Sequence, residues 1–379
     1  MSESYDVIVV GAGVFGAWTA HHLGRSGRSV ALLDAYGAGN SRSSSGGESR
    51  VLRMNYREQE IYTRWSLNSL RQWIELFEQV NRPELFQKTG VLWTPAADDP
   101  NTAGTLQTLE RCGVVFETLS QPELTRRFPQ IRYTSERVGV LEPESGLALA
   151  RRAVQAVVAD AIRNGVDYFR EAALATDGRE VRTQSGRALT ASIFVYCAGP
   201  WLPKIFPELL EGRIRPTRQE IFFFGTDPGD RRFASPEMPV WLDFTDERGA
   251  YTLPDIENRG FKLAFDRHGP AFDPDTGDRL ASGVDAARAF LAERFPALAN
   301  APLLESRVCQ YENTSSGDFL IDRHPGFDNV WLVGGGSGHG FKHGPMLGEY
   351  VTGLIEGSGN VEERFSLASK GREAKRAVY

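Results

Sequence analysis

Hydrophobic residues at the start of the chain predict a strand, a helix and a second strand in close succession. Residues 5–10, YDVIVV, form an apolar run rich in Val and Ile, which is typical of a buried strand. Residues 14–25 suit a helix that Gly27 would end, and residues 29–33 form a second apolar run. This order predicts a βαβ unit.

Three glycines separate the first strand from the helix at G-x-G-x-x-G spacing: Gly11, Gly13 and Gly16. The first permits a tight turn, the second lets a pyrophosphate approach the backbone, and the third lets helix and strand pack closely. The start of the helix then offers free N–H groups to phosphates. Asp34 ends the second run, where a carboxylate can accept hydrogen bonds from a ribose. The unit therefore predicts a site for a dinucleotide with a free ribose hydroxyl, such as FAD or NAD.

The same patterns predict further elements along the rest of the chain. Helical periodicity is expected over residues 58–80, 106–112, 122–128, 146–164, 285–295 and 344–356. Short strands are expected near 90–93, 114–117, 166–171, 180–183, 193–197, 307–311, 319–322 and 329–333. Four more, at 219–224, 240–244, 251–254 and 260–265, are separated by turns and suit an antiparallel sheet. Helices and strands alternate at both ends, so an α/β fold is expected.

A second glycine-rich segment follows the last predicted strand. Five glycines fall in the eight residues before Lys342, which lets the backbone approach a ligand closely. Residues 198–201, AGPW, form a small-residue turn after another buried strand. Ligands of open parallel sheets bind at the carboxyl ends of strands, where both segments would lie.

Composition and charge narrow the classes of function. A length of 379 residues favours two domains, and a net charge of −6 gives no basic surface for nucleic acid. No apolar stretch is long enough for a bilayer, and no signal peptide is expected. The cysteines Cys112, Cys197 and Cys309 are too few and too scattered for disulfides or a zinc site. We therefore expect a cytoplasmic protein with no membrane, nucleic-acid or metal partner.

Arg50 and Arg53 follow a loop rich in Gly and Ser. On a helix or an irregular turn, a spacing of three can put both guanidinium groups on one side. Two close cations suit a carboxylate or a phosphate, whereas the alternative is a solvated surface pair.

Six segments occur in an order that resembles the monomeric sarcosine oxidase family of FAD-dependent amine oxidases, within the glycine oxidase and D-amino-acid oxidase superfamily. They are the N-terminal unit, SSSGGESRVLR at residues 43–53, CAGPW at 197–201, GFKLAF at 260–265, Cys309 and GSGHGFKHGP at 336–345. The resemblance implies a discontinuous Rossmann-like FAD-binding domain, residues 1–83, 141–215 and 313–379. It also implies an α+β substrate domain with an antiparallel sheet, residues 84–140 and 216–312.

The resemblance assigns roles by position in the chain. It implies that Cys309 joins FAD through a thioether, that Lys262 lies where oxygen is reduced, and that Arg53 and Lys342 hold a substrate carboxylate. Arg50 would lie near the flavin, Tyr251 and Tyr311 in the active site, and His339 would be structural or contact the flavin. The expected cofactor contacts are Gly11, Gly13, Val14, Phe15, Gly16, Asp34, Ser43, Ser44, Arg50, Ala198, Gly199, Trp201, Cys309, Gly336, Gly338, His339, Gly340, Phe341 and Lys342.

Two positions depart from the family pattern, because Gly46 and Asp266 stand where sarcosine oxidases carry histidines. The loss of two imidazoles is expected to widen or re-charge the pocket. Asp266 could accept a hydrogen bond from a substrate ammonium or could face away from the pocket. These changes argue against sarcosine itself, whereas Arg53 and Lys342 still favour a carboxylate.

The resemblance implies a monomeric oxidase of a secondary, N-methyl or cyclic α-amino acid that forms an imine and then hydrogen peroxide from molecular oxygen. Three alternatives stay open at this point. A dehydrogenase of the same fold would pass electrons to another carrier, a nicotinamide enzyme would bind NAD, and a flavin-carrying subunit would have no catalysis of its own.

Overall fold

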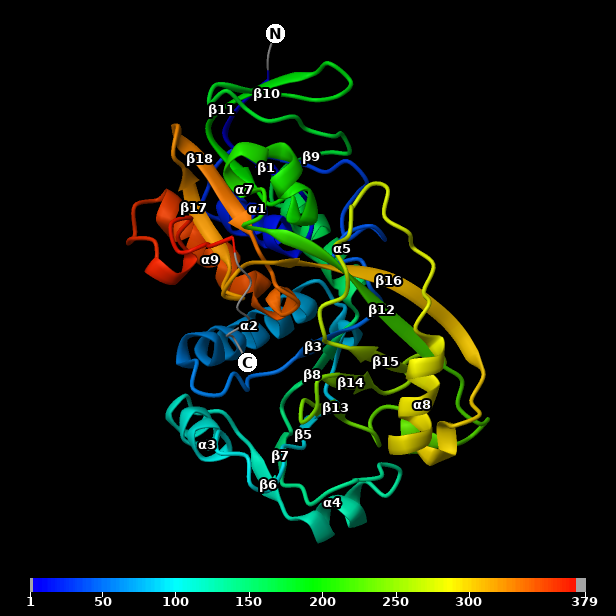
Figure 1. Ribbon diagram of the computed structural model, residues 1–379. Helices are drawn as coiled ribbons and strands as arrows, with labels where there is room; N and C mark the ends of the chain where they lie inside the picture. The colour runs from blue at the N-terminus through cyan, green and yellow to red at the C-terminus, as the bar shows by residue number, and fades with distance from the viewer. Residues whose placement is uncertain (1–2, 373–379) are drawn as a thin grey trace.

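The computed structural model describes residues 3–372, so the ends of the predicted domain ranges, residues 1–2 and 373–379, lie outside it. Its strands form two large sheets and one small sheet (Figure 1). The α/β fold class expected from the sequence is confirmed, with helices packed on sheets built from distant parts of the chain.

The first large sheet has the strand order β17-β18-β11-β1-β2-β9, with β10 paired to β11. The four pairings from β18 to β9 are parallel, which places the carboxyl ends of β18, β11, β1 and β2 at one edge. The strands are β1 (Glu3–Val10), β2 (Val30–Leu33), β9 (Asp167–Phe169), β10 (Glu180–Arg182), β11 (Ala188–Tyr196), β17 (Leu320–His324) and β18 (Phe327–Gly334).

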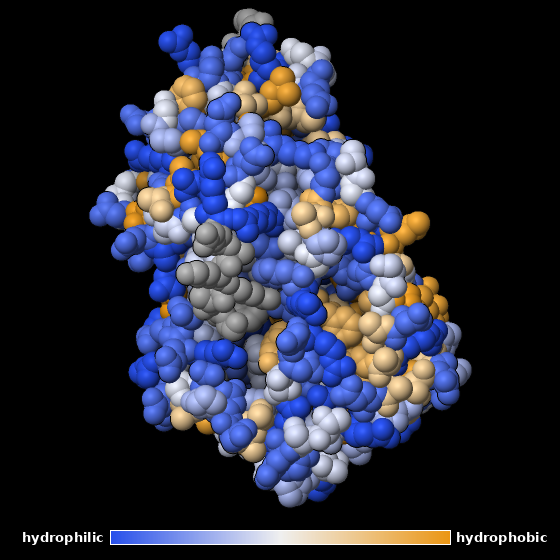
Figure 2. Space-filling view, in the orientation of Figure 1, coloured by the Kyte–Doolittle hydropathy of each residue, from blue (hydrophilic) through white to orange (hydrophobic). Residues whose placement is uncertain are grey.

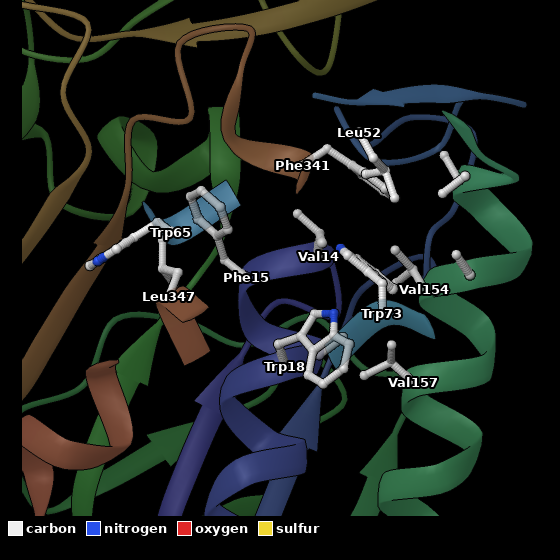
Figure 3. Packing of buried hydrophobic residues seen from close by; sticks show 14 of the residues in the cluster. Val14, Phe15, Trp18, Leu52, Trp65, Trp73, Val154, Val157, Phe341 and Leu347 are labelled. Carbon is white, nitrogen blue, oxygen red and sulfur yellow. The ribbon is translucent and has the colours of Figure 1, made fainter. Parts of the chain in front are cut away.

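Helix α1 (Val14–Arg25) packs between α5 (Ala150–Arg163) and α9 (Gly344–Ile355) on this sheet. Figure 3 shows Trp18 of α1 facing Trp73 of α2 (Glu60–Gln79), with Val154 and Val157 of α5 beside them. The Trp18 and Trp73 rings meet edge to face with centroids 5.0 Å apart. Each such pair adds about 0.5–1.5 kcal/mol to the gain from burial. This packing fixes the glycine turn that precedes α1.

The second large sheet has the order β16-β12-β15-β14-β13-β5-β7-β6. It is antiparallel as expected, except that β5 and β13 pair in parallel. Its strands are β5 (Val91–Trp93), β6 (Glu117–Leu119), β7 (Gly139–Glu142), β12 (Arg215–Phe224), β13 (Val240–Asp243), β14 (Ala250–Leu253), β15 (Phe261–Phe265) and β16 (Leu303–Asn313). The remaining helices are α3 (Thr102–Arg111), α4 (Gln121–Arg127), α6 (Leu202–Ile205), α7 (Pro207–Leu210) and α8 (Val284–Arg294).

The long strands β12 and β16 connect the two halves of the molecule, as Figure 1 shows. They pair from Arg215 with Asn313 to Phe224 with Leu303, so one end lies near the first sheet and the other beside α8. Cys309 is in the middle of β16, opposite Gln219. The domain boundaries expected from the sequence stay a prediction.

Three expectations about secondary structure were wrong. Residues 50–52 form strand β3 rather than a helix or turn, and the helix expected from Gly146 begins at Ala150, after strand β8 (Gly146–Ala148). With β4 (Phe86–Gln87), β3 and β8 form the small sheet. A Cβ atom at Gly146 would lie 2.1 Å from the Gln87 carbonyl oxygen, so close strand approach explains this glycine. The strand expected at 114–117 is shifted to Glu117–Leu119, where it pairs with β7.

Figure 2 shows a mostly hydrophilic face, with hydrophobic residues gathered where Figure 1 draws α8 and the far end of β16. Leu304 of β16 is 53% exposed there. Within residues 3–372, no helix is both long enough and apolar enough to cross a membrane.

Candidate functional site

A cavity of about 430 Å³ lies at the carboxyl ends of β1, β2 and β11. Both glycine-rich segments line it, together with the AGPW turn and the loop before Arg50. Of the residues expected to contact the cofactor, those on its wall are Gly11, Gly13, Val14, Phe15, Asp34, Ser43, Ser44, Arg50, Ala198, Gly199, Trp201, Gly336, Gly338, Gly340 and Phe341. Four further expected contacts are not among the wall residues: Gly16, Cys309, His339 and Lys342.

The glycines of the first segment are required by close backbone contacts. Gly11 has φ +104°, and a Cβ there would lie 2.3 Å from the Cys197 carbonyl oxygen. A Cβ at Gly16 would lie 1.8 Å from the Gly11 carbonyl oxygen, which explains why the third glycine supports the turn rather than lining the cavity. The second segment shows the same crowding, because a Cβ at Gly340 would lie 2.7 Å from the Phe15 ring. The two segments therefore form one continuous wall.

Asp34 holds the loop around this wall as well as lining it. Its Oδ2 accepts a hydrogen bond from the Ala12 N–H at 2.8 Å, and its Oδ1 accepts from Tyr36 N–H and Gly37 N–H, also at 2.8 Å. Ser45, which the sequence did not single out, accepts from the first N–H of α1 at Val14, at 3.0 Å.

Buried polar groups on the cavity wall fit a ligand with many polar atoms. The Ser44 hydroxyl, the Gln310 Oε1 and the Glu312 Oε2 are buried oxygens for which the described residues provide no hydrogen-bond partner. Burial raises the pKa of Glu312 to about 7, so its carboxyl can donate a proton near neutrality. Buried polar groups normally have partners, and the ribityl hydroxyls and phosphates of FAD would provide them. These residues, with the glycine turn at the start of α1, fit FAD.

Arg53 and Lys342 meet at the ring of Tyr56, so the structure brings the two predicted cations together. The Arg53 guanidinium lies 4.4 Å from the Tyr56 ring centroid, and Lys342 Nζ donates to the Tyr56 hydroxyl at 2.8 Å. Both side chains are buried. Burial, with the added charge of Arg53, lowers the pKa of the Lys342 ammonium well below its usual value. An anion between these groups would restore the charged lysine.

Buried contacts hold both cations in place. The carboxylate of Glu142 accepts from the backbone N–H groups of Met54 and Asn55, at 2.7 and 3.1 Å, which fixes the segment after Arg53. On the other side, Trp73 Nε1 donates to the Lys342 carbonyl at 3.2 Å, and the Trp73 ring stacks on Phe341 with centroids 5.4 Å apart. Figure 3 shows Phe341 near Leu52 and Trp73 near Val14.

Lys262 and Arg50 form a second cationic pair around the carbonyl oxygen of Ser49. Lys262 Nζ and Arg50 Nη1 each donate to this oxygen at 2.9 Å. The second Arg50 nitrogen lies 3.3 Å from Cys309 Sγ. Burial, with the nearby charge of Arg50, lowers the pKa of Lys262 well below its usual value. The thiol, the guanidinium and the amine predicted to act on the flavin are therefore adjacent.

Tyr251, Tyr311 and Asp266 form a chain of hydrogen bonds between these two pairs. Tyr311 donates to the Asp266 carboxylate at 3.0 Å and is also hydrogen-bonded to Tyr251. Burial raises the pKa of Tyr251 to about 12, so its hydroxyl stays protonated at neutral pH. Asp266 is buried, lines a second cavity and is hydrogen-bonded to Tyr311, which lines the first.

Two expectations about this region need correction. Arg50 and Arg53 lie at the start of and just after a strand, and they serve two different cationic pairs rather than one. Gly46 does not widen the pocket, because a Cβ there would lie 1.8 Å from the Asn40 carbonyl oxygen. The backbone of the loop fills the space, so only Asp266 alters the charge of the pocket.

His339 is packed among aromatic rings. Its Nδ1 is 3.0 Å from the Tyr56 hydroxyl, its Nε2 is 2.9 Å from the Gly317 carbonyl, and its ring stacks on Phe319. His343 Nε2 lies 2.8 Å from the same Tyr56 hydroxyl. Sequence reasoning missed Tyr56, His343, Ser49 and Glu142, because no motif or periodicity distinguishes them from core residues.

Comparison with known proteins agrees with this geometry. The family model described as FAD dependent oxidoreductase matches residues 6–354. The monomeric sarcosine oxidase of Streptomyces avermitilis is 32% identical, over 93% of this chain and 94% of that protein. The N-methyl-L-tryptophan oxidase of Escherichia coli is 27% identical, over 93% of this chain and 95% of that protein. The crystal structure of L-proline dehydrogenase from P. horikoshii has a TM-score of 0.83 with 19% identity, over 97% of this chain and 98% of that chain.

The family model covers most of the chain, and its cofactor fits the cavity between the two glycine-rich segments. The chain therefore belongs to the FAD dependent oxidoreductase family and is a flavin enzyme of the amine and amino-acid oxidase type.

Proposed function

We propose that the chain oxidises the C–N bond of a secondary α-amino acid, N-methyl or cyclic, to an imine and passes the electrons to molecular oxygen. The imine then hydrolyses, and hydrogen peroxide is the second product. The observation that carries this proposal is the meeting of Arg53 and Lys342 at Tyr56, beside a cavity that fits FAD.

Arg53 and Lys342 bind the substrate carboxylate in this scheme. Two buried cations give a carboxylate both affinity and a fixed orientation. Their positions are set by the backbone contacts of Glu142 and by the Trp73 hydrogen bond to the Lys342 carbonyl. The carboxylate would therefore be held by groups that need little rearrangement when it binds.

Asp266 provides the negative charge of the proposed substrate site. Its carboxylate, held by Tyr311 at 3.0 Å, faces a cavity and can accept a hydrogen bond from the substrate amine. A zwitterionic amino acid then meets two cations at one end and an anion at the other. We assign no general base, since Tyr251 keeps its proton and His339 is held between Tyr56 and Gly317.

FAD, when bound, supplies the redox chemistry by accepting the electrons of the substrate and giving them to oxygen. Lys262 is buried, and in its protonated form it provides a positive charge for the negative charge that develops on oxygen. Relatives named monomeric sarcosine oxidase support a monomer, and the three free thiols of the described chain suit the reducing cytoplasm.

Anaerobic mixing with a panel of N-methyl and cyclic amino acids tests the proposed reaction. We expect at least one of them to bleach the flavin absorbance, and air to restore it with one equivalent of peroxide. The parent amines without a carboxylate serve as controls and are expected to react far more slowly. Bleaching that only an added dye reverses would identify a dehydrogenase, and no bleaching by any member would contradict the proposal.

We further propose a thioether between Cys309 Sγ and FAD. Arg50 supports this link, because its guanidinium donates to the sulfur at 3.3 Å and holds the side chain of Cys309 in one position. Acid precipitation is expected to leave yellow flavin on the pellet of the natural protein and a colourless pellet for Cys309→Ser. Cys112→Ser, at a buried cysteine that follows α3, is the matched control and should keep the colour. Flavin released from the natural protein by acid would contradict the thioether.

A further inference from the structure

A second cavity, of about 450 Å³, lies between the strands β5 and β13 and the loops that follow them. It is as large as the cavity that fits FAD, and it opens to solvent. Pockets of this size hold ligands well above the size of sarcosine. A small substrate that reacts at the flavin would leave this second cavity empty.

Three wall residues connect this cavity to the proposed carboxylate site. The carbonyl of Asn55 accepts a hydrogen bond from Arg53, and the Trp93 ring lies 4.8 Å from the Arg53 guanidinium. Asp266 forms the third connection, through its hydrogen bond with Tyr311. A substrate held by Arg53 would therefore have this cavity next to its other end.

The chemistry of the wall changes from the inner end to the mouth. Trp93, Val140, Leu242 and Phe244 are apolar and partly or fully buried, and the Trp93 and Phe244 rings touch with centroids 5.6 Å apart. Exposed charged residues, including Arg57, Glu247 and Arg267, stand at the mouth. The wall also has buried polar residues, Asn55, Thr94, Thr105 and Asp266. Its apolar patch favours a substituent that buries a ring or a long aliphatic chain against Trp93 and Phe244.

We propose that this cavity, the side-pocket lined by Trp93, Ala96, Leu242 and Phe244, takes a large apolar substituent of the substrate. The substrate class is then an amino acid with an aryl-alkyl or long alkyl group on its α-carbon or its nitrogen. This inference rests on the proposed function, because Arg53 and Lys342 must hold the carboxylate. Sarcosine fills none of this volume and is a poor substrate.

Binding of carboxylates that cannot be oxidised tests the inference without turnover. Calorimetric titration of the holoenzyme with 4-phenylbutyrate and with acetate is expected to show about 10²-fold tighter binding of the aryl acid, because burial of a phenyl-alkyl group from water contributes about this factor. Equal affinities would overturn the inference while leaving carboxylate binding, and with it the proposed function, intact.

A substitution that fills the side-pocket, compared with the same substitution outside it, gives a second test. Ala96 lines the side-pocket, whereas its exposed neighbour Ala97 does not. Ala96→Phe is expected to weaken 4-phenylbutyrate at least tenfold and acetate less than threefold, and Ala97→Phe is expected to change neither. Unaltered acetate binding also shows that the Ala96→Phe protein is folded. Equal loss for both acids with Ala96→Phe would overturn the inference.

Anaerobic flavin reduction identifies the atom that carries the substituent. N-methylphenylalanine and N-(2-phenylethyl)glycine are isomers that place the ring on carbon and on nitrogen, and at least one is expected to react at least tenfold faster than sarcosine. A faster reaction with sarcosine would overturn the inference alone. A flavin that none of the three reduces would overturn the proposed function as well.

Discussion

Replacement of Lys342 by Met is expected to make flavin reduction about 10²–10³-fold less efficient, measured as the reduction rate constant divided by the substrate dissociation constant. The variant lacks the lysine that pairs with the substrate carboxylate in a buried site. Lys342 Nζ is held at 2.8 Å by Tyr56 and at 2.9 Å by the His339 carbonyl, so its direction is fixed before substrate binds. The loss should be specific to substrates with a carboxylate. An amine without one should react with the variant and the natural protein at similar rates.

The pH dependence of binding gives this prediction a second measurement. The charged form of Lys342 attracts a carboxylate, and its pKa in the free protein lies well below the usual value. Affinity should therefore fall as the pH rises through that lowered pKa, and Lys342→Met should lose this dependence. Lys370→Met removes another buried lysine, whose ammonium donates to the Ser369 hydroxyl at 3.1 Å, and is the control for general destabilisation. Equal effects of the two variants on substrate binding would contradict the role of Lys342.

Local patterns were enough to predict the elements that frame the cofactor cavity. The helix expected at residues 14–25 is α1, and the helix expected at 344–356 is α9 to within one residue. Each has a glycine-rich start and a continuous periodic run, so nearby residues determine it. The small sheet could not be predicted, since β8 pairs with residues that lie 60 to 98 positions earlier in the chain. Pairing over such distances leaves no periodic signal in the chain.

The residues of the candidate site could be predicted, but the way in which they pair in space could not. Family resemblance singled out Arg50, Arg53, Lys262 and Lys342, and the structure groups them into two pairs, one around Tyr56 and one around the Ser49 carbonyl. Neither Tyr56 nor the Ser49 carbonyl could be recognised in the sequence, because buried tyrosines are common and every residue has a backbone carbonyl. The side-pocket could not be predicted from the sequence either, since its walls come from β5, β13 and loops far apart in the chain. Cavities of this kind are created by packing and not by a local motif.

Replacement of Lys262 by Met is expected to slow reoxidation of the reduced enzyme by oxygen about 10²–10³-fold, the usual cost of removing one buried electrostatic partner of a developing charge. Lys262 is 2% exposed and lies beside Arg50, so no other lysine of the described chain shares its place against Ser49. Anaerobic reduction by substrate should change less than about threefold, because Arg53 and Lys342 remain. Stopped-flow absorbance measures the two half-reactions separately.

Lys342→Met and Lys262→Met are each other's controls, because both remove a buried lysine from the same region. Lys342→Met should slow flavin reduction by substrate and leave reoxidation by oxygen unchanged. Lys262→Met should slow reoxidation and leave reduction nearly unchanged. With a dye in place of oxygen, Lys262→Met should turn over at nearly the natural rate, since the charge is needed only where oxygen is reduced. A Lys262→Met enzyme that reacts normally with oxygen would show that the lysine serves only to hold the Ser49 carbonyl. Oxygen would then be reduced with the help of another group, and the proposed oxidase reaction would stand without a role for Lys262 in it.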